Sequence, residues 1–562
     1  MARKARLEQP KMPRSRGELP DPFYYLNNFQ TVLASIDRRY AALLSSEERQ
    51  FIAHFSTLPR ASSALLVRMV MRQGSLFRRS RLQYPEIGDA AAAVASLIQA
   101  GWVDDSPHLE VTQLQKLLTK AELLRYFSVS RTYRNFNKSD LVAVLRAWHP
   151  GSKSFLAWCQ ESGDRVYHLA VAGLCERFRL MFFGNFDQDW TEFVLTDLGI
   201  CAYESIPESL QSPVFRTRTH VDSFEQIYRC RKWLDAGLAT DEVVALVPPP
   251  ITDCDWLEER RQKLLFQIAG AYERSANRGA ALTVLSTCTH RGARLRAIRL
   301  HERAHEWSMA RELCLQAQRN PENDSEHAQV SRLLPRLNRR QGVSGTNPPG
   351  TIGIPAFDIE IDMPADDYIV EYLVRDRLAQ QSRENTRIHY VENSLVMSLF
   401  GLLCWTAIFA PIPGAFFHDF QYGPADLSSG QFYERRRSEF IECLAQLESD
   451  RYKSIIRRCF AAKAGIQSPF VAWGMLSKPL LDCALWCFPP GHLRLWFEWI
   501  VRDIQANRAG FPDLVQFWPR DQRYRMIEVK APGDRLQDNQ RRLLEFCVSH
   551  RMPVSVCHVR WV

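Results

Sequence analysis

The sequence predicts a multidomain protein that is mostly α-helical in its N-terminal and middle regions and α/β in its C-terminal domain. Its 562 residues exceed the size at which a single hydrophobic core keeps growing, so we expect three or four domains. Helical patterns recur in several segments before residue 340. A stretch rich in Gly, Pro and Ser then follows at 341–355, QGVSGTNPPGTIGIP, which we interpret as a linker and the main domain boundary.

The composition is typical of a soluble globular protein, with 46% hydrophobic and 24% charged residues. Lysines and arginines number 72 against 63 acidic residues, a mild basic excess that suits a polyanionic partner but also occurs on ordinary solvated faces. The 14 cysteines include no CxxC pair, which indicates reduced thiols. His301 and His305 alone provide too few ligands for a structural zinc site.

Two segments have features of export or membrane signals. Residues 1–22 are basic and lack an apolar core, which favours a flexible basic arm over a secretory signal. The segment 395–417 carries no charge, but Pro411 and Pro413 interrupt it, so its apolar helix is too short to span a bilayer. We therefore expect a buried helix there and no membrane partner.

Residues 23–110 alternate helical patterns with short breaks, as in a winged-helix-like DNA-binding region. Arg68 and Arg72 are the candidate phosphate contacts of this region. Further arginines nearby are interleaved with aromatic residues: Arg78, Arg79, Arg81, Phe77 and Tyr84. This mixture suits duplex binding, and an ordinary solvated helix face is the alternative.

Residues 111–150 predict two short amphipathic helices around a polar loop. Thr119 and Glu122 have capping-box spacing, and Ser139 is expected at the start of the second helix. The layout resembles the SAP module, a small helix-loop-helix unit that binds duplex DNA. Its candidate phosphate-facing residues are Arg131, Arg134 and Lys138.

Residues 151–340 are predicted to be helical and to contain TPR-like repeats. The sequence YERSANRGAAL at 272–282 is echoed by HERAHEWSMAREL at 301–313, with Glu273 and Glu302 offset by 29 residues. That offset is near the period of helical-hairpin repeats. We expect this region to space and orient domains rather than to carry chemistry.

The domain after the linker, 356–562, ends in an α/β pattern. We predict a strand opening at Asp513, a turn at 519–522, a strand at 524–530, a helix at 536–549 and a strand at 553–561. Because side chains alternate along a strand, Glu528 and Lys530 share one face while the other face is apolar. A carboxylate and an ammonium group are thus presented together, beside a second carboxylate from the neighbouring strand.

This arrangement fits phosphodiester hydrolysis. Asp513, Glu528 and the carbonyl of Val529 are hard oxygen ligands for Mg²⁺ or Mn²⁺. Lys530 is placed to orient or deprotonate a water molecule and to offset charge in the transition state. The spacing matches the PD-(D/E)xK pattern of restriction-endonuclease-like nucleases, although an ExK triplet also arises by chance on solvated strands.

Four further residues are candidates for the same site. Glu392, at the head of the apolar helix, is either a third acidic metal ligand or an ordinary first-turn carboxylate. Gln540 lies on the helix after the motif, where its amide could orient a catalytic group. Asp534 and Arg535 follow the turn after Lys530 and are candidate DNA contacts.

Several segments together resemble the Fanconi-associated nuclease family, whose C-terminal VRR-type nuclease domain belongs to the PD-(D/E)xK group. They cover nearly the whole chain in the family's order: YYLNNFQTVL, LQYPEIG, the SAP-like stretch, YVENSLVMSLFGLLCW, FPDL, IEVKAPGDRLQDNQ and VSVCHVRW. The IEVK run and the residues after it are the most specific of these. An N-terminal ubiquitin-binding zinc finger, which longer members carry, has no counterpart in the Cys and His spacing.

The resemblance implies a metal-dependent nuclease selective for branched or flapped double-stranded DNA. Such an enzyme cuts near 5′ flaps, acts in the 5′ to 3′ direction and serves interstrand-crosslink repair, in the cytoplasm at the nucleoid of a bacterium or in a eukaryotic nucleus. The resemblance assigns metal binding to Glu392, Asp513 and Glu528 and catalysis to Lys530. It also places Arg68 and Arg72 where the family holds duplex DNA. The alternatives are a catalytically silent DNA-binding scaffold and a junction resolvase with the same core.

Overall fold

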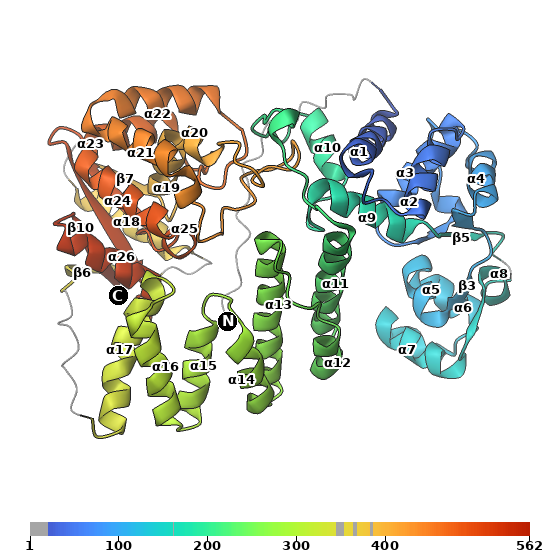
Figure 1. The fold of residues 1–562 in the computed structure, drawn as a ribbon, viewed down its shortest axis with the longest axis horizontal. Coiled ribbons are helices and arrows are strands. Elements are labelled where there is room, and N and C mark those ends of the chain that lie inside the picture. Colours follow the sequence, from blue (N-terminus) through green and yellow to red (C-terminus); the bar gives the residue numbers. More distant parts are fainter. Residues whose placement is uncertain (1–20, 161, 344–352, 364–367, 383–385) are drawn as a thin grey trace. The chain divides into compact units, whose positions relative to one another are not determined.

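The computed structural model describes residues 21–160, 162–343, 353–363, 368–382 and 386–562, which form two units (Figure 1). The N-terminal unit contains the described residues up to 201 together with 213–221, and the C-terminal unit contains 202–212 and 222–562. Nearly all of the predicted arm at 1–22 and most of the predicted linker at 341–355 lie outside the described residues.

The N-terminal unit begins with helices packed around a small antiparallel sheet. The helices are α1 (Tyr24–Tyr40), α2 (Ser46–Phe55), α3 (Arg60–Val70), α4 (Ala90–Gln99), α9 (Ala172–Phe183) and α10 (Thr191–Asp197). The strands, in spatial order, are β1 (Leu76–Arg78), β5 (Val166–Leu169) and β2 (Val103–Asp104). Because β5 is the central strand, residues 166–169 belong to this sheet, whereas the sequence pattern predicts them among the helical repeats. Strand pairing across an intervening module depends on tertiary contact, which local spacing does not reveal.

Between β2 and β5 the chain forms a small helical module with its own core. Its elements are β3 (His108–Glu110), α5 (Val111–Leu117), α6 (Lys120–Tyr126), η2 (Arg131–Asn135), α7 (Lys138–Trp148), β4 (Ser152–Ser154) and α8 (Phe155–Trp158). The capping box predicted for Thr119 and Glu122 is confirmed. The start predicted at Ser139 is wrong, because Asn137 caps α7 and its side chain accepts the N–H of Asp140 at 2.9 Å.

The first part of the C-terminal unit is a series of helices in which each lies beside the next (Figure 1). They are α11 (Arg218–Asp235), which starts in the N-terminal unit, and α12 (Thr240–Ala245), α13 (Asp255–Arg274), α14 (Arg278–Thr287), α15 (Ala293–Arg303), α16 (Trp307–Arg319) and α17 (Asp324–Arg340). Glu273 on α13 forms an ion pair with Arg296 on α15, and Glu302 on α15 pairs with Arg336 on α17 at 2.5 Å. Glu273 and Glu302, which are offset by 29 residues in the two similar segments, therefore have equivalent roles. Each links one helical hairpin to the next.

The rest of the C-terminal unit is built on a five-stranded mixed sheet. The strands are β6 (Ala356–Ile361), β7 (Arg387–Tyr390), β8 (Leu514–Trp518), β9 (Arg523–Lys530) and β10 (Val554–Trp561), in the spatial order β6-β10-β9-β8-β7. β9 pairs in parallel with β10 and antiparallel with β8. The strands predicted at 524–530 and 553–561 each agree with the structure to within one residue, and the helix predicted at 536–549 is α26 (Asp538–Ser549).

Helices cover both faces of this sheet. One face packs against α18 (Val370–Gln381) and includes Ile527 and Val529, as the alternation along β9 predicts. The other face packs against a larger helical core. Its elements are α19 (Leu395–Leu403), α20 (Trp405–Ile408), η4 (Glu434–Arg436), α21 (Arg437–Ala445), η5 (Gln446–Glu448), α22 (Arg451–Ala462), α23 (Lys478–Cys487), α24 (Pro490–Arg502), α25 (Ile504–Asn507) and α26.

The apolar stretch at 395–417 is buried, as expected. Every residue of α19 is buried, and α20 ends before Pro411 and Pro413. Among the helices of the described residues, none combines the length and the hydrophobicity needed to cross a membrane.

Candidate active site

The centre of the candidate site is Glu528. Its side chain lies on the face of β9 opposite Ile527 and Val529, which is the face that packs against the larger helical core. Its side chain is fully buried, and one of its oxygens, Oε1, accepts hydrogen bonds from the Lys530 ammonium group at 2.7 Å and the Gln540 amide at 2.6 Å. The other oxygen, Oε2, is buried and has no hydrogen-bond partner in the part of the chain that the structure describes. A buried carboxylate oxygen without a partner is costly, so this atom is suited to an additional cationic ligand.

Asp513 lies immediately before β8 and beside β9. Its side chain is 7% exposed, and its Oδ2 accepts the backbone N–H of Val529 at 2.8 Å. This bond fixes the Asp513 carboxylate against the peptide that joins Glu528 to Val529. The strand predicted to open at Asp513 begins one residue later in the structure.

Gln540 reaches Glu528 because α26 begins close to the sheet. Its amide nitrogen binds Glu528 while its amide oxygen accepts the backbone N–H of Gln537 at 2.9 Å, in a capping box that starts the helix. The same side chain therefore defines the start of α26 and orients the carboxylate.

Glu392 lies in the turn between β7 and α19, where it accepts a hydrogen bond from the Tyr390 hydroxyl. The backbone N–H of Val391 donates to the carbonyl of Asp513 at 2.7 Å, so this turn is joined to the start of β8. The structure thus brings together Glu392, Asp513, Glu528, Lys530 and Gln540 from four separate parts of the chain.

Burial and mutual repulsion dominate the electrostatics of these carboxylates. Desolvation, followed by the charge of Glu528, raises the pKa of Asp513. Desolvation also raises the pKa of Glu528, which the Lys530 ammonium lowers and the charges of Glu392 and Glu371 raise further. A divalent cation would remove this repulsion, and carboxylate oxygens are the ligands that Mg²⁺ and Mn²⁺ prefer.

The donor set therefore fits a hard divalent cation, although the side chains do not already enclose one. Within the described ranges, no three His, Cys, Asp or Glu side chains converge closely enough to form a metal site. One oxygen of Glu392, Oε2, accepts the Tyr390 hydroxyl, so this carboxylate is already anchored on one side.

Three residues near the site were not found from the sequence. Glu371, in the first turn of α18, contributes charge at Asp513, Glu528 and Tyr390. Tyr390 holds Glu392, and Asn393 accepts the backbone N–H groups of Gly510 and Phe511 at 2.7 and 2.9 Å. In the sequence, only their position beside Glu392 could have indicated Tyr390 and Asn393 as site residues. Glu371 lies in no recognisable motif.

The candidate DNA contacts differ in their exposure and in whether the side chain is already bound to another group of the protein. Arg68 donates to Glu86 and lies over the Tyr25 ring, with 3.8 Å between the guanidinium carbon and the ring centroid, so it is already bound inside the protein. Arg72 is exposed and donates to the carbonyl of Arg81 at 3.0 Å. Three further candidates are exposed: Arg134, Asp534 and Arg535. Lys138 is half-buried, and the structure does not describe the side chain of Arg131.

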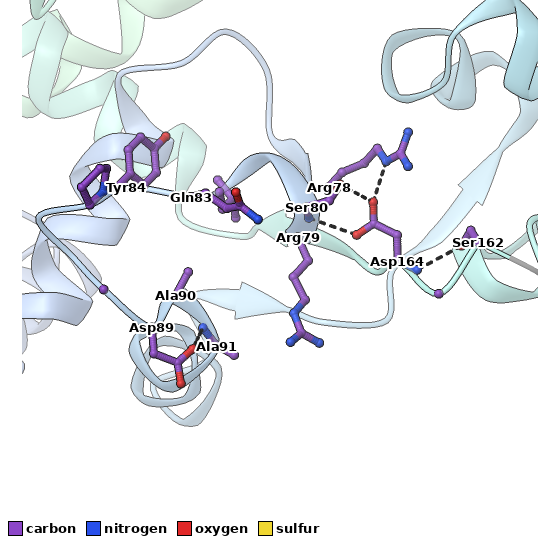
Figure 2. Close-up of a pocket in the computed structure, with 14 residues that line it drawn as sticks. Arg78, Arg79, Ser80, Gln83, Tyr84, Asp89, Ala90, Ala91, Ser162 and Asp164 are labelled. Carbon is purple, nitrogen blue, oxygen red and sulfur yellow. Dashed lines mark hydrogen bonds and ion pairs between the residues drawn. The ribbon is translucent and has the colours of Figure 1, made fainter.

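A separate pocket of about 830 Å³ lies in the N-terminal unit, between the β1–α4 segment and residues 162–164 (Figure 2). Arg78 on its wall is neutralised by Asp164 at 2.7 Å and by Glu122 at 2.5 Å. Asp164 also accepts the Ser80 hydroxyl. The pocket contains none of the predicted catalytic residues, so it is not the site of the chemistry.

Comparison with known proteins shows which family the chain belongs to. Three family models match: "FAN1, HTH domain" at 23–104, "Fanconi anemia-associated nuclease SAP domain" at 108–158 and "VRR-NUC domain" at 447–561. A Fanconi-associated nuclease 1 homolog from Pseudomonas aeruginosa is 48% identical over 553 residues, covering 98% of each chain. This chain belongs to the Fanconi-associated nuclease family. It is therefore an enzyme that hydrolyses DNA, with the predicted fold class and SAP module.

A more distant relative and two solved structures agree with this family assignment. A Fanconi-associated nuclease 1 homolog from Arabidopsis thaliana is 24% identical over 615 residues, covering 96% of this chain and 67% of the relative. The crystal structure of paFAN1 bound to 5′-flap DNA with a two-nucleotide flap and a gap superposes with a TM-score of 0.93 at 48% identity, covering 97% of this chain and 99% of that one. The one-nucleotide-flap complex gives a TM-score of 0.91, covering 96% and 100%. The Fanconi-associated nuclease fold is thus present along essentially the whole chain.

Proposed function

We propose that this protein is a divalent-metal-dependent, structure-selective DNA endonuclease that cuts near 5′ flaps, degrades DNA in the 5′ to 3′ direction and acts in interstrand-crosslink repair. One observation supports the chemistry above the others: two buried carboxylates and an ammonium group meet just before β8 and on β9, and one carboxylate oxygen has no partner among the described residues. The flap preference rests on the similarity to paFAN1, whose crystal structures contain 5′-flap DNA.

Glu392, Asp513, Glu528 and the carbonyl of Val529 are the groups that would hold Mg²⁺ or Mn²⁺. The bound ion supplies a polarised phosphate and a water molecule with a lowered pKa. The protein's own part is to hold the ligands in a fixed orientation. Asp513 is fixed by the Val529 N–H, and Glu528 is fixed by Lys530 and Gln540.

Lys530 is 8% exposed, and its ammonium group lies 2.7 Å from Glu528 Oε1. From this position it orients a water molecule at the scissile phosphate and offsets negative charge as the phosphate gains its fifth oxygen. The remaining donors of the ammonium group are available for these contacts, because Lys530 has one hydrogen-bond acceptor among the described residues.

The test is cleavage of four end-labelled DNAs, a 5′ flap, a 3′ flap, a four-way junction and a plain duplex, each with EDTA, Mg²⁺ or Mn²⁺. We expect cutting of the 5′ flap that depends on metal and exceeds cutting of the other shapes. A preference for the four-way junction would instead identify a resolvase. Asp513→Ala and Lys530→Ala should abolish cleavage, and the matched control is Asp521→Asn, an exposed carboxylate in the turn between the same strands.

The repair role is tested in cells. A strain lacking this enzyme should be sensitive to a DNA crosslinking agent, and the wild-type protein should restore resistance while Asp513→Ala should not. We expect the protein at the nucleoid in a bacterium and in the nucleus of a eukaryote. Equal survival of the deletion and wild-type strains would contradict the repair role without affecting the nuclease assignment.

A further inference from the structure

An unusual group of aromatic side chains lies on the SAP module. Tyr133 contacts Phe136 and Trp148 edge to face, with ring centroids 5.1 and 5.2 Å apart. Phe136 is 36% exposed and Trp148 is 49% exposed, although the module has an apolar core that could bury such rings. We call these three residues the aromatic patch. Exposed rings of this size in mutual contact are suited to packing against another flat group.

The surroundings of the aromatic patch are strongly basic. Residues 108–158 contain eight lysines and arginines but three acidic residues, so this short module carries more than half of the chain's net charge of +9. Arg134 lies in η2 with Tyr133, and Lys138 begins the helix that ends at Trp148. Lys120 donates to the carbonyl of Arg134 at 2.7 Å, which brings a third cation to the same loop.

Two of the acidic residues are already bound. Glu122 is paired with Arg78, and Asp140 accepts from the Asn137 side chain at 2.7 Å. Among the described residues, neither carboxylate forms an ion pair with Arg134 or Lys138. Aromatic rings beside cations form the combination that binds single-stranded nucleic acid, in which the rings stack on bases and the cations hold phosphates.

We propose that the aromatic patch binds unpaired bases of a DNA strand joined to the duplex, such as a flap. Bases inside a duplex are covered by their neighbours, so only an unpaired segment offers faces for Phe136 and Trp148 to stack on. Arg134 and Lys138 hold the phosphates of that segment. This inference rests on the proposed function for its substrate, and it assigns to the SAP module a role in addition to duplex binding.

The experiment compares two fluorescein-labelled DNAs in EDTA, so that nothing is cleaved. Both carry the same duplex and a 5′ tail of about ten nucleotides, either thymidines or abasic residues with the same phosphates. We expect the full-length wild-type protein to bind the thymidine tail about tenfold more tightly, and the Phe136→Ala/Trp148→Ala double variant to bind both tails equally. Fluorescence anisotropy gives both dissociation constants.

Three controls make the result specific. Trp148→Phe keeps a ring and should keep most of the preference, whereas Leu156→Ala removes another exposed apolar side chain of the module, 45% exposed, and should leave the preference unchanged. Arg134→Ala/Lys138→Ala should weaken binding of both tails alike. Unfolding temperatures of all variants should match the wild type, since these side chains lie at the surface.

The proposal is overturned if the wild type binds both tails equally, or if the double variant keeps the preference. It is also overturned if polyglutamate displaces the labelled DNA as well as oligothymidine of equal charge does, because the patch would then bind acidic chains in general. None of these outcomes bears on cleavage, so a failure here is distinguishable from a failure of the proposed function.

Discussion

The two oxygens of Glu528 lie in different surroundings, and that difference organises the site. Oε1 accepts two hydrogen bonds, and Oε2, although buried, accepts none from the residues that the structure describes. The carboxylate is therefore fixed on one side and unsatisfied on the other. A ligand that brings positive charge to Oε2 gains an interaction without having to reorganise the group first, which is the advantage of a site built before its ligand arrives.

Gln540 is the residue that holds this geometry without touching the reacting atoms. Gln540→Ala should lower the cleavage rate by about 10- to 100-fold and raise the Mg²⁺ concentration needed for half-maximal activity. Gln540→Glu keeps the helix cap but places a second negative charge beside Glu528, so it should be worse than alanine. Single-turnover rates across a Mg²⁺ series measure both effects, and a slower rate with no change in metal requirement would show that Gln540 acts only through α26.

The raised pKa of Asp513, caused first by burial and then by Glu528, predicts how stability depends on pH. A carboxyl group whose pKa is higher in the folded state stabilises the fold below its unfolded pKa, and this contribution disappears as pH rises through the folded pKa. Without metal, the wild type should therefore become less stable as pH rises from about 4 to about 8. Asp513→Asn has no charge to bury and should be destabilised less over that range.

Thermal unfolding in EDTA at several pH values measures this, with Asp521→Asn as the control for removing an exposed carboxylate. Adding Mg²⁺ should raise the unfolding temperature of the wild type at high pH more than that of Asp513→Asn, because the ion binds only the folded, deprotonated site. If the unfolding temperatures of the wild type and Asp513→Asn change with pH in parallel, burial does not raise the pKa of Asp513.

At the scale of elements, the site depends on how three segments are joined. Asn393 adopts a left-handed backbone with φ of 48° and binds the Gly510 and Phe511 amides, which fixes the Glu392 turn to the approach of β8. Gly510 has φ of 106°, and a Cβ there would lie 2.9 Å from the backbone of Asn539 on α26. Glycine at this position lets the helix come near enough for Gln540 to reach Glu528.

Gly510→Ala should therefore separate α26 from the sheet. We expect a destabilisation of about 1–3 kcal/mol from the strained backbone and the clash with Asn539, together with a lower cleavage rate. Gly465→Ala is a matched control, since Gly465 also has a positive φ, of 80°, but nothing lies within 4 Å of its added Cβ. An equal fall in activity in both variants would indicate general destabilisation rather than displacement of Gln540.

These elements also mark how far sequence reasoning could go. The alternation along β9 was sufficient to place Glu528 and Lys530 on one face and Ile527 and Val529 on the other. The roles of Glu371 and Asn393 were missed because their partners lie many residues away, in the segment before β8 and in β9. The cap of α7 was assigned to Ser139 rather than Asn137, because both residues can cap and only the backbone conformation distinguishes them.

At the scale of the whole molecule, three of the candidate DNA contacts and the candidate catalytic residues lie in different units. The candidate phosphate-binding residues Arg72, Arg134 and Lys138 belong to the N-terminal unit, and the carboxylates belong to the C-terminal unit. Neutralising the three cations together should weaken binding of every DNA shape. It should also reduce the slope of log K against log salt by roughly 0.9 for each phosphate that the protein no longer neutralises. Anisotropy titrations at several salt concentrations measure the slope.

Arg68 provides the comparison, because its guanidinium group is already bound to Glu86 and lies over Tyr25. Arg68→Ala leaves a carboxylate unpaired and should lower the unfolding temperature, with little change in the salt slope. An unchanged slope in the triple variant, or a clear change in Arg68→Ala, would assign duplex binding to Arg68 and its neighbours instead.

The order of the sheet, β6-β10-β9-β8-β7, has a consequence for synthesis. β10 lies between β6 and β9, yet it follows every other strand of the sheet in the chain. While the protein is being translated, β6 has no neighbour to pair with until residues 554–561 leave the ribosome, and the sheet beneath Glu528 is incomplete. The growing polypeptide thus contains every candidate catalytic side chain before its sheet is complete. A chain that ends before β10 lacks an interior strand of the sheet rather than an edge strand.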